Sequence, residues 1–263
     1  MKRGPGMALL LLVALCGGTL APGRALANDF ENCIRGFQAA EQGYFDIAIH
    51  YCTKALRSGD LAPSQEIEVL TNRRVAYEGK RLFARADKDF DTAFSITMEE
   101  FESAIKRLRV PDSASVFFYR GLLLAQGRKY GRAIRMFDRV LELTKDDANA
   151  YYNRGLANFL KGKLERASSD FEATLRITPN HTSAHYNLGL SYYQLRRFDE
   201  AVANFSRAIE IAPEYAQAFH NRGFSHQAKG DAELAKADFA QAYRLAPDDS
   251  RIRITAHAAG LVR

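Results

Sequence analysis

The sequence predicts an all-α fold, an α-solenoid of about six helix pairs that ends in a C-terminal capping helix. Four glycines recur at intervals of 34 residues: Gly121, Gly155, Gly189 and Gly223. The same interval separates columns of alanine, phenylalanine and proline, at Ala133, Ala167, Ala201 and Ala235, at Phe137, Phe171, Phe205 and Phe239, and at Pro179, Pro213 and Pro247. The composition, with 47% hydrophobic and 26% charged residues, excludes long disorder.

The N-terminus has the pattern of a secretory signal peptide. Lys2 and Arg3 precede a short apolar run at 7–16, and an Ala-Leu-Ala cleavage site follows at 25–27. We therefore expect residues 1–27 to be removed and the mature protein to lie in a bacterial periplasm. The alternative, a retained membrane anchor, is disfavoured because the run is shorter than the roughly 18 apolar residues that a spanning helix needs.

The net charge of +6 needs a correction for this leader. The leader contains three basic residues, Lys2, Arg3 and Arg24, and no acidic residue, which leaves +3 for the mature chain. An excess of that size does not indicate a nucleic-acid partner. No other apolar run is long enough for a stable membrane span.

Four regular repeats are expected over 114–249, starting at residues 114, 148, 182 and 216. In the third of them, Gly189 and Ala201 lie where the two helices touch, because a larger side chain would push the helices apart. Phe205 then fills the gap between neighbouring helices, and Pro213 ends the second helix.

Two divergent repeats, at 29–62 and 67–100, make up an expected N-terminal block of residues 28–100. Arg74 replaces the glycine of the second one, which predicts looser helix packing there. Residues 101–113 then break the period, and their apolar spacing predicts an extension of the preceding helix or a short extra helix. Residues 250–263 should form a capping tail, because the last repeat must cover its apolar face.

The repeat resembles the tetratricopeptide repeat, a pair of antiparallel helices, in an exported bacterial form. Over residues 182–215, family positions are occupied by Leu188, Gly189, Tyr192, Phe198, Ala201, Phe205, Ala208 and Pro213. The resemblance implies a right-handed superhelix that binds proteins on its concave face. Because six repeats use nearly the whole mature chain, no segment is left for a catalytic domain, and we expect no enzyme.

Two charged columns run through the repeats. Arginine recurs at Arg35, Arg73, Arg120, Arg154 and Arg222, and aspartate at Asp89, Asp170 and Asp238. Every repeat with the aspartate also has the arginine. The functional hypothesis is an arginine ladder for an acidic partner. The structural one, an ion pair between the two helices of each repeat, is favoured because partly buried arginines need partners.

The resemblance also implies which residues line the peptide-binding groove. Carried over position by position, they are Asn72, Phe118, Tyr119, Tyr152, Asn153, Leu156, Phe159, Tyr186, Asn187, Leu190, Tyr193, His220, Asn221 and Phe224. Asparagine is a poor helix former, and its amide can both donate to and accept from a peptide backbone. The alternative is that these asparagines bond within the solenoid and that the aromatic side chains pack between repeats.

Cys33 and Cys52 fall on the two helices of the first repeat at roughly matching heights. Export would allow a disulfide between them, and two free thiols are the alternative. The histidines, cysteines and carboxylates show no metal-ligand spacing, and no phosphate loop, HExxH or GxSxG motif is present. We therefore expect no metal and no cofactor.

These features predict a non-catalytic scaffold that binds an extended peptide or a partner helix in the concave groove. Two alternatives stay open. The chain is an accessory or regulatory subunit of a cell-envelope enzyme, or it is a structural protein that self-associates into a homo-oligomer. The partner itself is not encoded in the pattern, because repeat proteins share one scaffold across unrelated tasks.

Overall fold

The computed structural model describes residues 24–41 and 44–261. This part of the chain contains thirteen helices, α2 to α14, and no strand, which confirms the all-α fold. It divides into two compact units, unit 1 up to Pro111 and unit 2 from Asp112, and each is described by itself. The predicted leader lies outside the described residues up to position 23, and α2 begins at Arg24.

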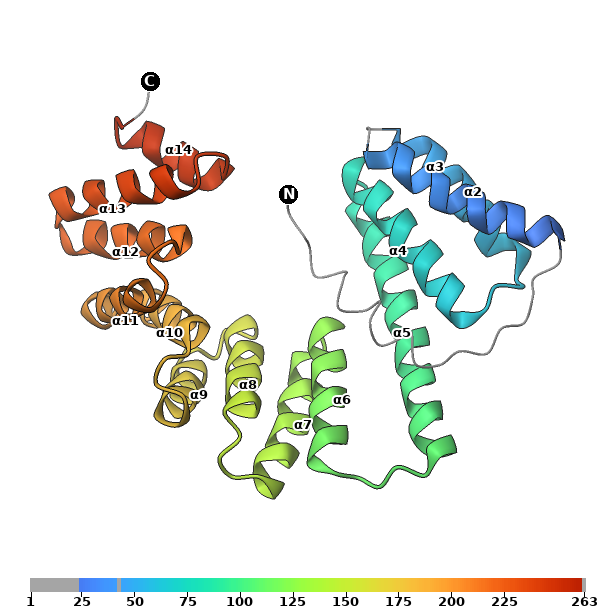
Figure 1. The fold of residues 1–263 in the computed structure, drawn as a ribbon, viewed down its shortest axis with the longest axis horizontal. Coiled ribbons are helices and arrows are strands. Elements are labelled where there is room, and N and C mark those ends of the chain that lie inside the picture. Colours follow the sequence, from blue (N-terminus) through green and yellow to red (C-terminus); the bar gives the residue numbers. More distant parts are fainter. Residues whose placement is uncertain (1–23, 42–43, 262–263) are drawn as a thin grey trace. The chain divides into compact units, whose positions relative to one another are not determined.

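Unit 1 contains two helix pairs (Figure 1). The first pair is α2 (Arg24–Glu41) with α3 (Phe45–Ser58), and the second is α4 (Pro63–Gly79) with α5 (Phe83–Leu108). α5 has 26 residues, whereas α3 has 14, because it continues through the first part of the segment that breaks the sequence period. It ends where Arg109 adopts a left-handed backbone conformation (φ 52°).

Arg74 occupies the place of a repeat glycine in α4. Its guanidinium lies over the ring of Phe90, 5.5 Å from the centroid, and its Nε atom is buried without a hydrogen-bond partner in the described part of the chain. Glu78 lies 3.6 Å from the same nitrogen. The arginine therefore stacks on the aromatic ring that a glycine would otherwise let approach the helix backbone.

Unit 2 contains four helix pairs and a final short helix. The helices are α6 (Ala114–Gln126), α7 (Tyr130–Leu143), α8 (Ala148–Leu160), α9 (Leu164–Ile177), α10 (Thr182–Gln194), α11 (Phe198–Ile211), α12 (Ala216–Lys229), α13 (Ala232–Leu245) and α14 (Ser250–Ala258). Each helix packs on the next, and α14 covers the end of α13. The even-numbered helices from α6 to α12 are the first helices of the pairs.

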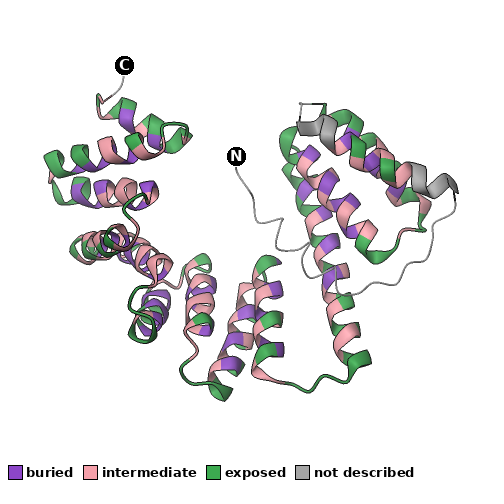
Figure 2. Ribbon diagram, in the orientation of Figure 1, coloured by how far each residue is buried: buried purple, intermediate pink, exposed green. Residues whose placement is uncertain are grey.

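Glycine and phenylalanine set the helix spacing in unit 2. A Cβ atom placed on Gly189 would lie 2.8 Å from the ring of Phe205, so only glycine lets the ring approach this closely. The equivalent glycines of the other three pairs face their phenylalanines in the same way. Phe171 and Phe205 are fully buried, and Figure 2 shows buried positions recurring along the facing sides of the helices.

Candidate functional site

The groove residues predicted in unit 2 form one continuous row. They lie on the first helices α6, α8, α10 and α12, and each of these helices contacts the next one directly. We call the set the first-helix row: Phe118, Tyr119, Tyr152, Asn153, Leu156, Phe159, Tyr186, Asn187, Leu190, Tyr193, His220, Asn221 and Phe224. Tyr119 is 48% exposed and the others are half-buried, so the row presents a polar and aromatic surface.

Asn72, the remaining predicted groove residue, lies on α4 in unit 1. It is 9% exposed, so most of its surface is covered by its own unit. Asn72 therefore belongs to unit 1 and is not part of the first-helix row.

Two asparagines of the row use both N–H donors inside the protein. Asn187 Nδ2 donates to the backbone carbonyl one turn earlier (2.9 Å) and to the hydroxyl of Tyr152 on the preceding first helix (3.1 Å). Asn221 repeats this arrangement with the carbonyl one turn earlier (2.9 Å) and the hydroxyl of Tyr186 (2.8 Å). The N–H groups of these two asparagines thus bond within the solenoid, which is the alternative to ligand binding stated above. Within the described residues, each Oδ1 atom accepts no hydrogen bond.

Asn153 differs from the other two. Its Nδ2 donates to the carbonyl of Asn149 (2.8 Å), but the preceding first helix has Phe118, which lacks a hydroxyl, where the later pairs have tyrosine. In the described part of the chain, one N–H and the Oδ1 atom of Asn153 are therefore free to bond with a ligand.

Two side chains that sequence reasoning missed complete the aromatic part of the row. His181 stacks on Tyr152 with ring centroids 4.7 Å apart, and Tyr215 stacks on Tyr186 at 4.9 Å. His181 also caps α10, because its Nδ1 accepts from the N–H of Ala184 (3.1 Å). Both residues directly precede a first helix, at the last position of the 34-residue frame. This shared position could have identified them from the sequence.

The row continues onto α14. The 34-residue period places this helix as the first helix of a seventh pair, and His220 Nε2 lies 2.9 Å from Thr255 Oγ1 on it. The Thr255 hydroxyl donates to the carbonyl of Arg251 (3.0 Å), so the imidazole N–H is the donor in the contact between the two side chains.

Burial favours the neutral forms of four titratable side chains on or beside the row, His220, Tyr152, Tyr186 and Tyr215. Burial lowers the pKa of His220, and the positive charge of Arg251 lowers it further. Burial also raises the pKa of the Tyr152, Tyr186 and Tyr215 hydroxyls above the ordinary value of 10.0. These shifts favour uncharged hydrogen-bonding groups at the four positions, and none of the row residues is Lys, Arg, Asp or Glu.

The recurring 16-residue spacing of arginine and aspartate produces ion pairs between the two helices of a pair. Arg73 contacts Asp89 at 2.7 Å, Arg154 contacts Asp170 at 2.6 Å, and Arg222 contacts Asp238 at 2.7 Å. Each aspartate is buried and each arginine is partly buried. These arginines are thus engaged in the solenoid, as the structural hypothesis expects.

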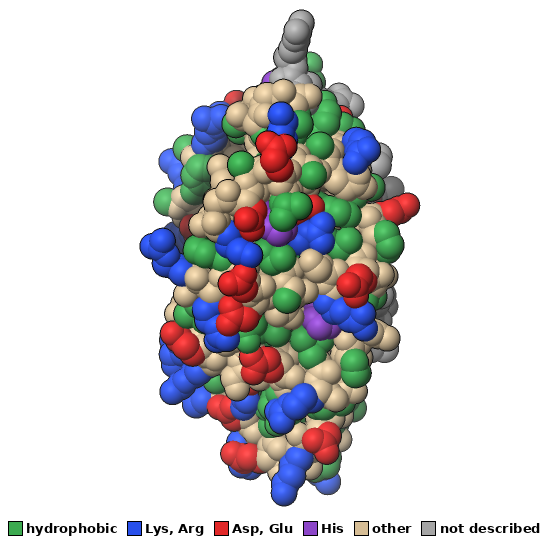
Figure 3. Space-filling model, turned by 90° about the vertical axis from the view of Figure 1, so that its left-hand side faces the viewer, with side chains coloured by type: hydrophobic (Ala, Val, Ile, Leu, Met, Phe, Trp, Pro, Cys, Tyr) green, Lys and Arg blue, Asp and Glu red, His purple; other side chains and the backbone are tan. Residues whose placement is uncertain are grey.

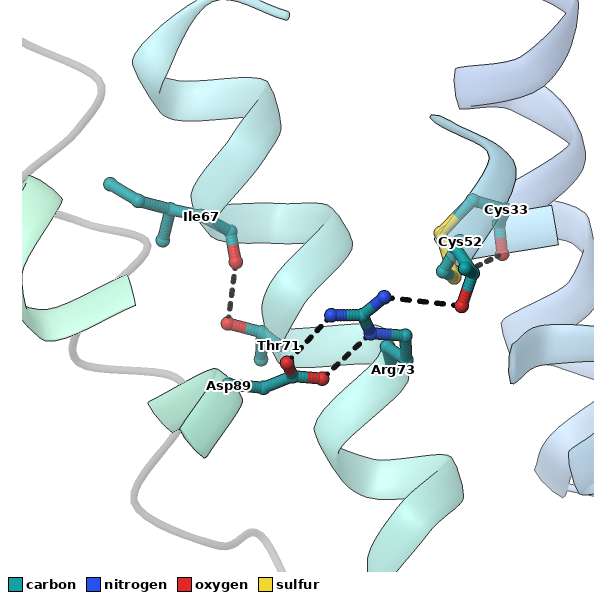
Figure 4. Close-up of a disulfide and its surroundings, with 7 residues drawn as sticks. Cys33, Cys52, Ile67, Thr71, Arg73 and Asp89 are labelled. Atoms are coloured by element: carbon teal, nitrogen blue, oxygen red, sulfur yellow. Dashed lines mark hydrogen bonds and ion pairs between the residues drawn. A yellow bond between two sulfur atoms is a disulfide. The ribbon is translucent and has the colours of Figure 1, made fainter. Parts of the chain in front are cut away.

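Cys33 and Cys52 form a disulfide between α2 and α3 (Figure 4). Their Cα atoms are 4.5 Å apart and both side chains are fully buried, together with Ala55 and Val69. The bond links the two helices of the first pair. Figure 4 also shows the fork of Arg73 on Asp89 in the neighbouring pair.

Among the described residues, no three His, Cys, Asp or Glu side chains are grouped so that they could hold a metal ion. No described helix combines the length and the apolar character needed to cross a membrane.

The fold and the repeat geometry agree with comparisons to known proteins. Three models of the tetratricopeptide repeat match residues 120–181, 182–215 and 216–249. Residues 120–249 therefore consist of tetratricopeptide repeats, the units of a class of helical repeat proteins. No curated protein sequence matches it.

Solved structures show the same fold at low sequence identity. A crystal structure of MamA has 21% identity and a TM-score of 0.55, covering 63% of this chain and 96% of its own. MamA from Desulfovibrio magneticus RS-1, from residue 41 to its end, has 20% identity and a TM-score of 0.50, covering 72% and 99%. YrrB, described as a TPR protein with an unusual peptide-binding site, has 19% identity and a TM-score of 0.52, covering 79% and 97%.

Proposed function

We propose that the protein is a non-catalytic scaffold that holds an extended peptide or a partner helix on the first-helix row. The observation that carries the proposal is the repeated asparagine. Asn187 and Asn221 have both N–H groups bonded inside the protein, which fixes each amide and leaves its Oδ1 atom as an acceptor. A peptide backbone presents N–H donors, so one amide acceptor in each of three consecutive repeats, at Asn153, Asn187 and Asn221, suits binding that does not depend on the peptide sequence.

The aromatic side chains supply the apolar part of the proposed contact. Phe159, Tyr193 and Leu190 are half-buried around the core of the central pairs, so each retains surface that a ligand can cover. Aromatic residues with one polar end are enriched at protein interfaces for this reason. Because the row contains no Lys, Arg, Asp or Glu side chain, we expect ligand binding to depend little on ionic strength.

The test must spare residues that support the fold. Tyr152 and Tyr186 are unsuitable, because each holds an asparagine and packs against a core phenylalanine. The row variant therefore combines Tyr119→Ala, Asn153→Ala and Tyr193→Ala. The matched control combines three exposed apolar positions outside the row, Leu143→Ala, Ile177→Ala and Leu234→Ala.

The full mature chain and both variants are used as bait in a cell-envelope extract, and retained proteins are quantified by mass spectrometry. We expect a partner that is retained by the wild type and the control but reduced at least tenfold with the row variant. Equal retention by all three baits, or equal loss from both variants, would show that the row is not the binding surface.

We also propose that the protein is exported and functions outside the cytoplasm. The leader pattern at 1–27 motivates this, and the Cys33–Cys52 disulfide is compatible with an oxidising compartment. N-terminal sequencing of the protein from its native cell should find Asn28 as the first residue. An N-terminus at Met1 would refute removal of the leader.

A further inference from the structure

Charges of both signs are interspersed over the face of the molecule shown in Figure 3, as on an ordinary solvated surface. Two neighbouring turns of unit 2 instead carry a large excess of positive charge. Residues 127–132 and 160–166 carry six basic side chains and one acidic one, a net charge of +5 in 13 residues, against +6 for the whole chain. We call this set the basic end: Arg128, Lys129, Arg132, Lys161, Lys163 and Arg166.

The two turns lie next to each other in space. Lys161, in the turn between α8 and α9, reaches the start of α7, since a Cβ atom placed on Gly131 would be 3.0 Å from its Nζ atom. All members of the basic end are exposed except Lys163, which is half-buried. The positive charges of two consecutive pairs therefore combine into one surface.

The backbone at one of these positions suits glycine better than a basic residue. Arg128 has a left-handed backbone (φ 56°), a conformation that favours glycine, and the next pair has Gly162 (φ 75°) at the same place. Helix dipoles do not explain the charges either. Each turn joins the C-terminus of one helix, which favours a cation, to the N-terminus of the next, which disfavours it.

We propose that the basic end docks the protein on the surface of an anionic lipid bilayer. The turns lie at the ends of helix pairs and most of their basic side chains are exposed, so they suit a broad surface better than a small anion, which needs a concave pocket. Leu160, 58% exposed, directly precedes Lys161 and can enter the interfacial region between lipid headgroups. Basic side chains near an apolar anchor are the usual means by which a protein without a spanning helix holds an anionic membrane.

The opposite ends of the helix pairs are acidic, and this charge should orient the protein on the membrane. The segments that join consecutive pairs, 144–147, 178–181, 212–215 and 246–249, contain five acidic residues and one lysine. An anionic surface repels these segments while it attracts the basic end. Lipid docking and ligand binding on the first-helix row are therefore separate activities, and either can fail without the other.

The test uses the full mature chain and sedimentation with vesicles. One set contains phosphatidylglycerol and phosphatidylcholine at a ratio of about 3 to 7, and the other contains phosphatidylcholine alone. The end variant combines Arg128→Gly, Arg132→Gln, Lys161→Gln and Lys163→Gln. The matched control removes four exposed basic side chains elsewhere in unit 2, by Lys145→Gln, Arg176→Gln, Arg244→Gln and Arg253→Gln.

We expect the wild type to bind the anionic vesicles at about 0.1 M salt and to dissociate at about 0.5 M, because salt screens exposed charges. Each charge lost from the basic end should weaken binding about fivefold, so the end variant should bind at least about a hundredfold more weakly. The control should lose much less. The melting temperature of the end variant should show that it is folded, since glycine is favoured at position 128.

Three results would overturn the proposal. The first is no binding of the wild type to anionic vesicles, or equal binding to both vesicle sets. The second is equal weakening by the end variant and the control. The third is retention of the wild type by a DNA duplex at a salt concentration where the vesicles do not bind, which would identify a nucleic acid as the polyanion.

Discussion

Arg154 should contribute more to stability than the aspartate with which it pairs. Asp170 is buried, and its carboxylate accepts from Arg154 Nη2 (2.6 Å), from Arg154 Nε (3.1 Å) and from Asn158 Nδ2 (2.9 Å). Arg154 is 23% exposed and also donates from Nη1 to Asp138 of the preceding pair (2.7 Å). The aspartate thus has one cationic partner, whereas the arginine has two anionic ones.

This difference in the number of partners determines how much each substitution should lower the free energy of unfolding. Arg154→Met leaves a buried carboxylate with a single amide donor, and breaking a buried pair in this way costs about 3–5 kcal/mol. Asp170→Asn keeps the arginine paired with Asp138 and removes charge-assisted hydrogen bonds, at a cost of about 1–3 kcal/mol. A charge swap, Arg154→Asp with Asp170→Arg, should not restore stability, because the new carboxylate at position 154 would face Asp138.

The assay is urea unfolding followed by circular dichroism, with the free energy of unfolding compared among the variants. The pair Arg222–Asp238 provides an internal comparison, since Arg222 Nη1 donates to the hydroxyl of Ser206 (2.9 Å) and not to a second carboxylate. Asp238→Asn should therefore cost more than Asp170→Asn. If Asp170→Asn proves as costly as Arg154→Met, the account of the two partners is wrong.

Three other predictions concern the core, the disulfide and pH. Gly189→Ala should lower the free energy of unfolding by about 1–2 kcal/mol despite better helix propensity, because its Cβ would lie 2.8 Å from the Phe205 ring; an increase would contradict this packing. Cys52→Ser should cost about 3 kcal/mol, since it opens a loop with a sequence separation of 19; the wild type should gain 2 Da on reduction, and an unchanged mass would argue against the bond. Because burial lowers the folded-state pKa of His220, the unfolded state binds more protons, and stability should fall as pH drops from about 7 to about 5. His220→Gln should reduce that fall in thermal melts, and an identical pH dependence would refute it.

The predicted site was partly readable from the sequence. The 34-residue frame placed Tyr152, Asn187 and their equivalents on one kind of helix, and the structure makes a continuous row of them. The frame could not show that Asn187 donates to Tyr152, because the two residues are 35 positions apart and meet only when consecutive pairs stack. His181 was missed because it lies just outside the helix to which its ring contributes.

The sequence by itself determined the repeat, because small residues such as Gly189 and large ones such as Phe205 must alternate wherever helices cross closely. It also indicated the arginine–aspartate pairs, since their 16-residue separation recurs in each helix pair that contains them. Only the tertiary structure decided which hydrogen-bonding atoms remain open. Stacking of neighbouring pairs brings Asp138 to Arg154 and tyrosine hydroxyls to the asparagines. These contacts depend on the rotation of one repeat relative to the next, which the sequence of a single repeat does not determine.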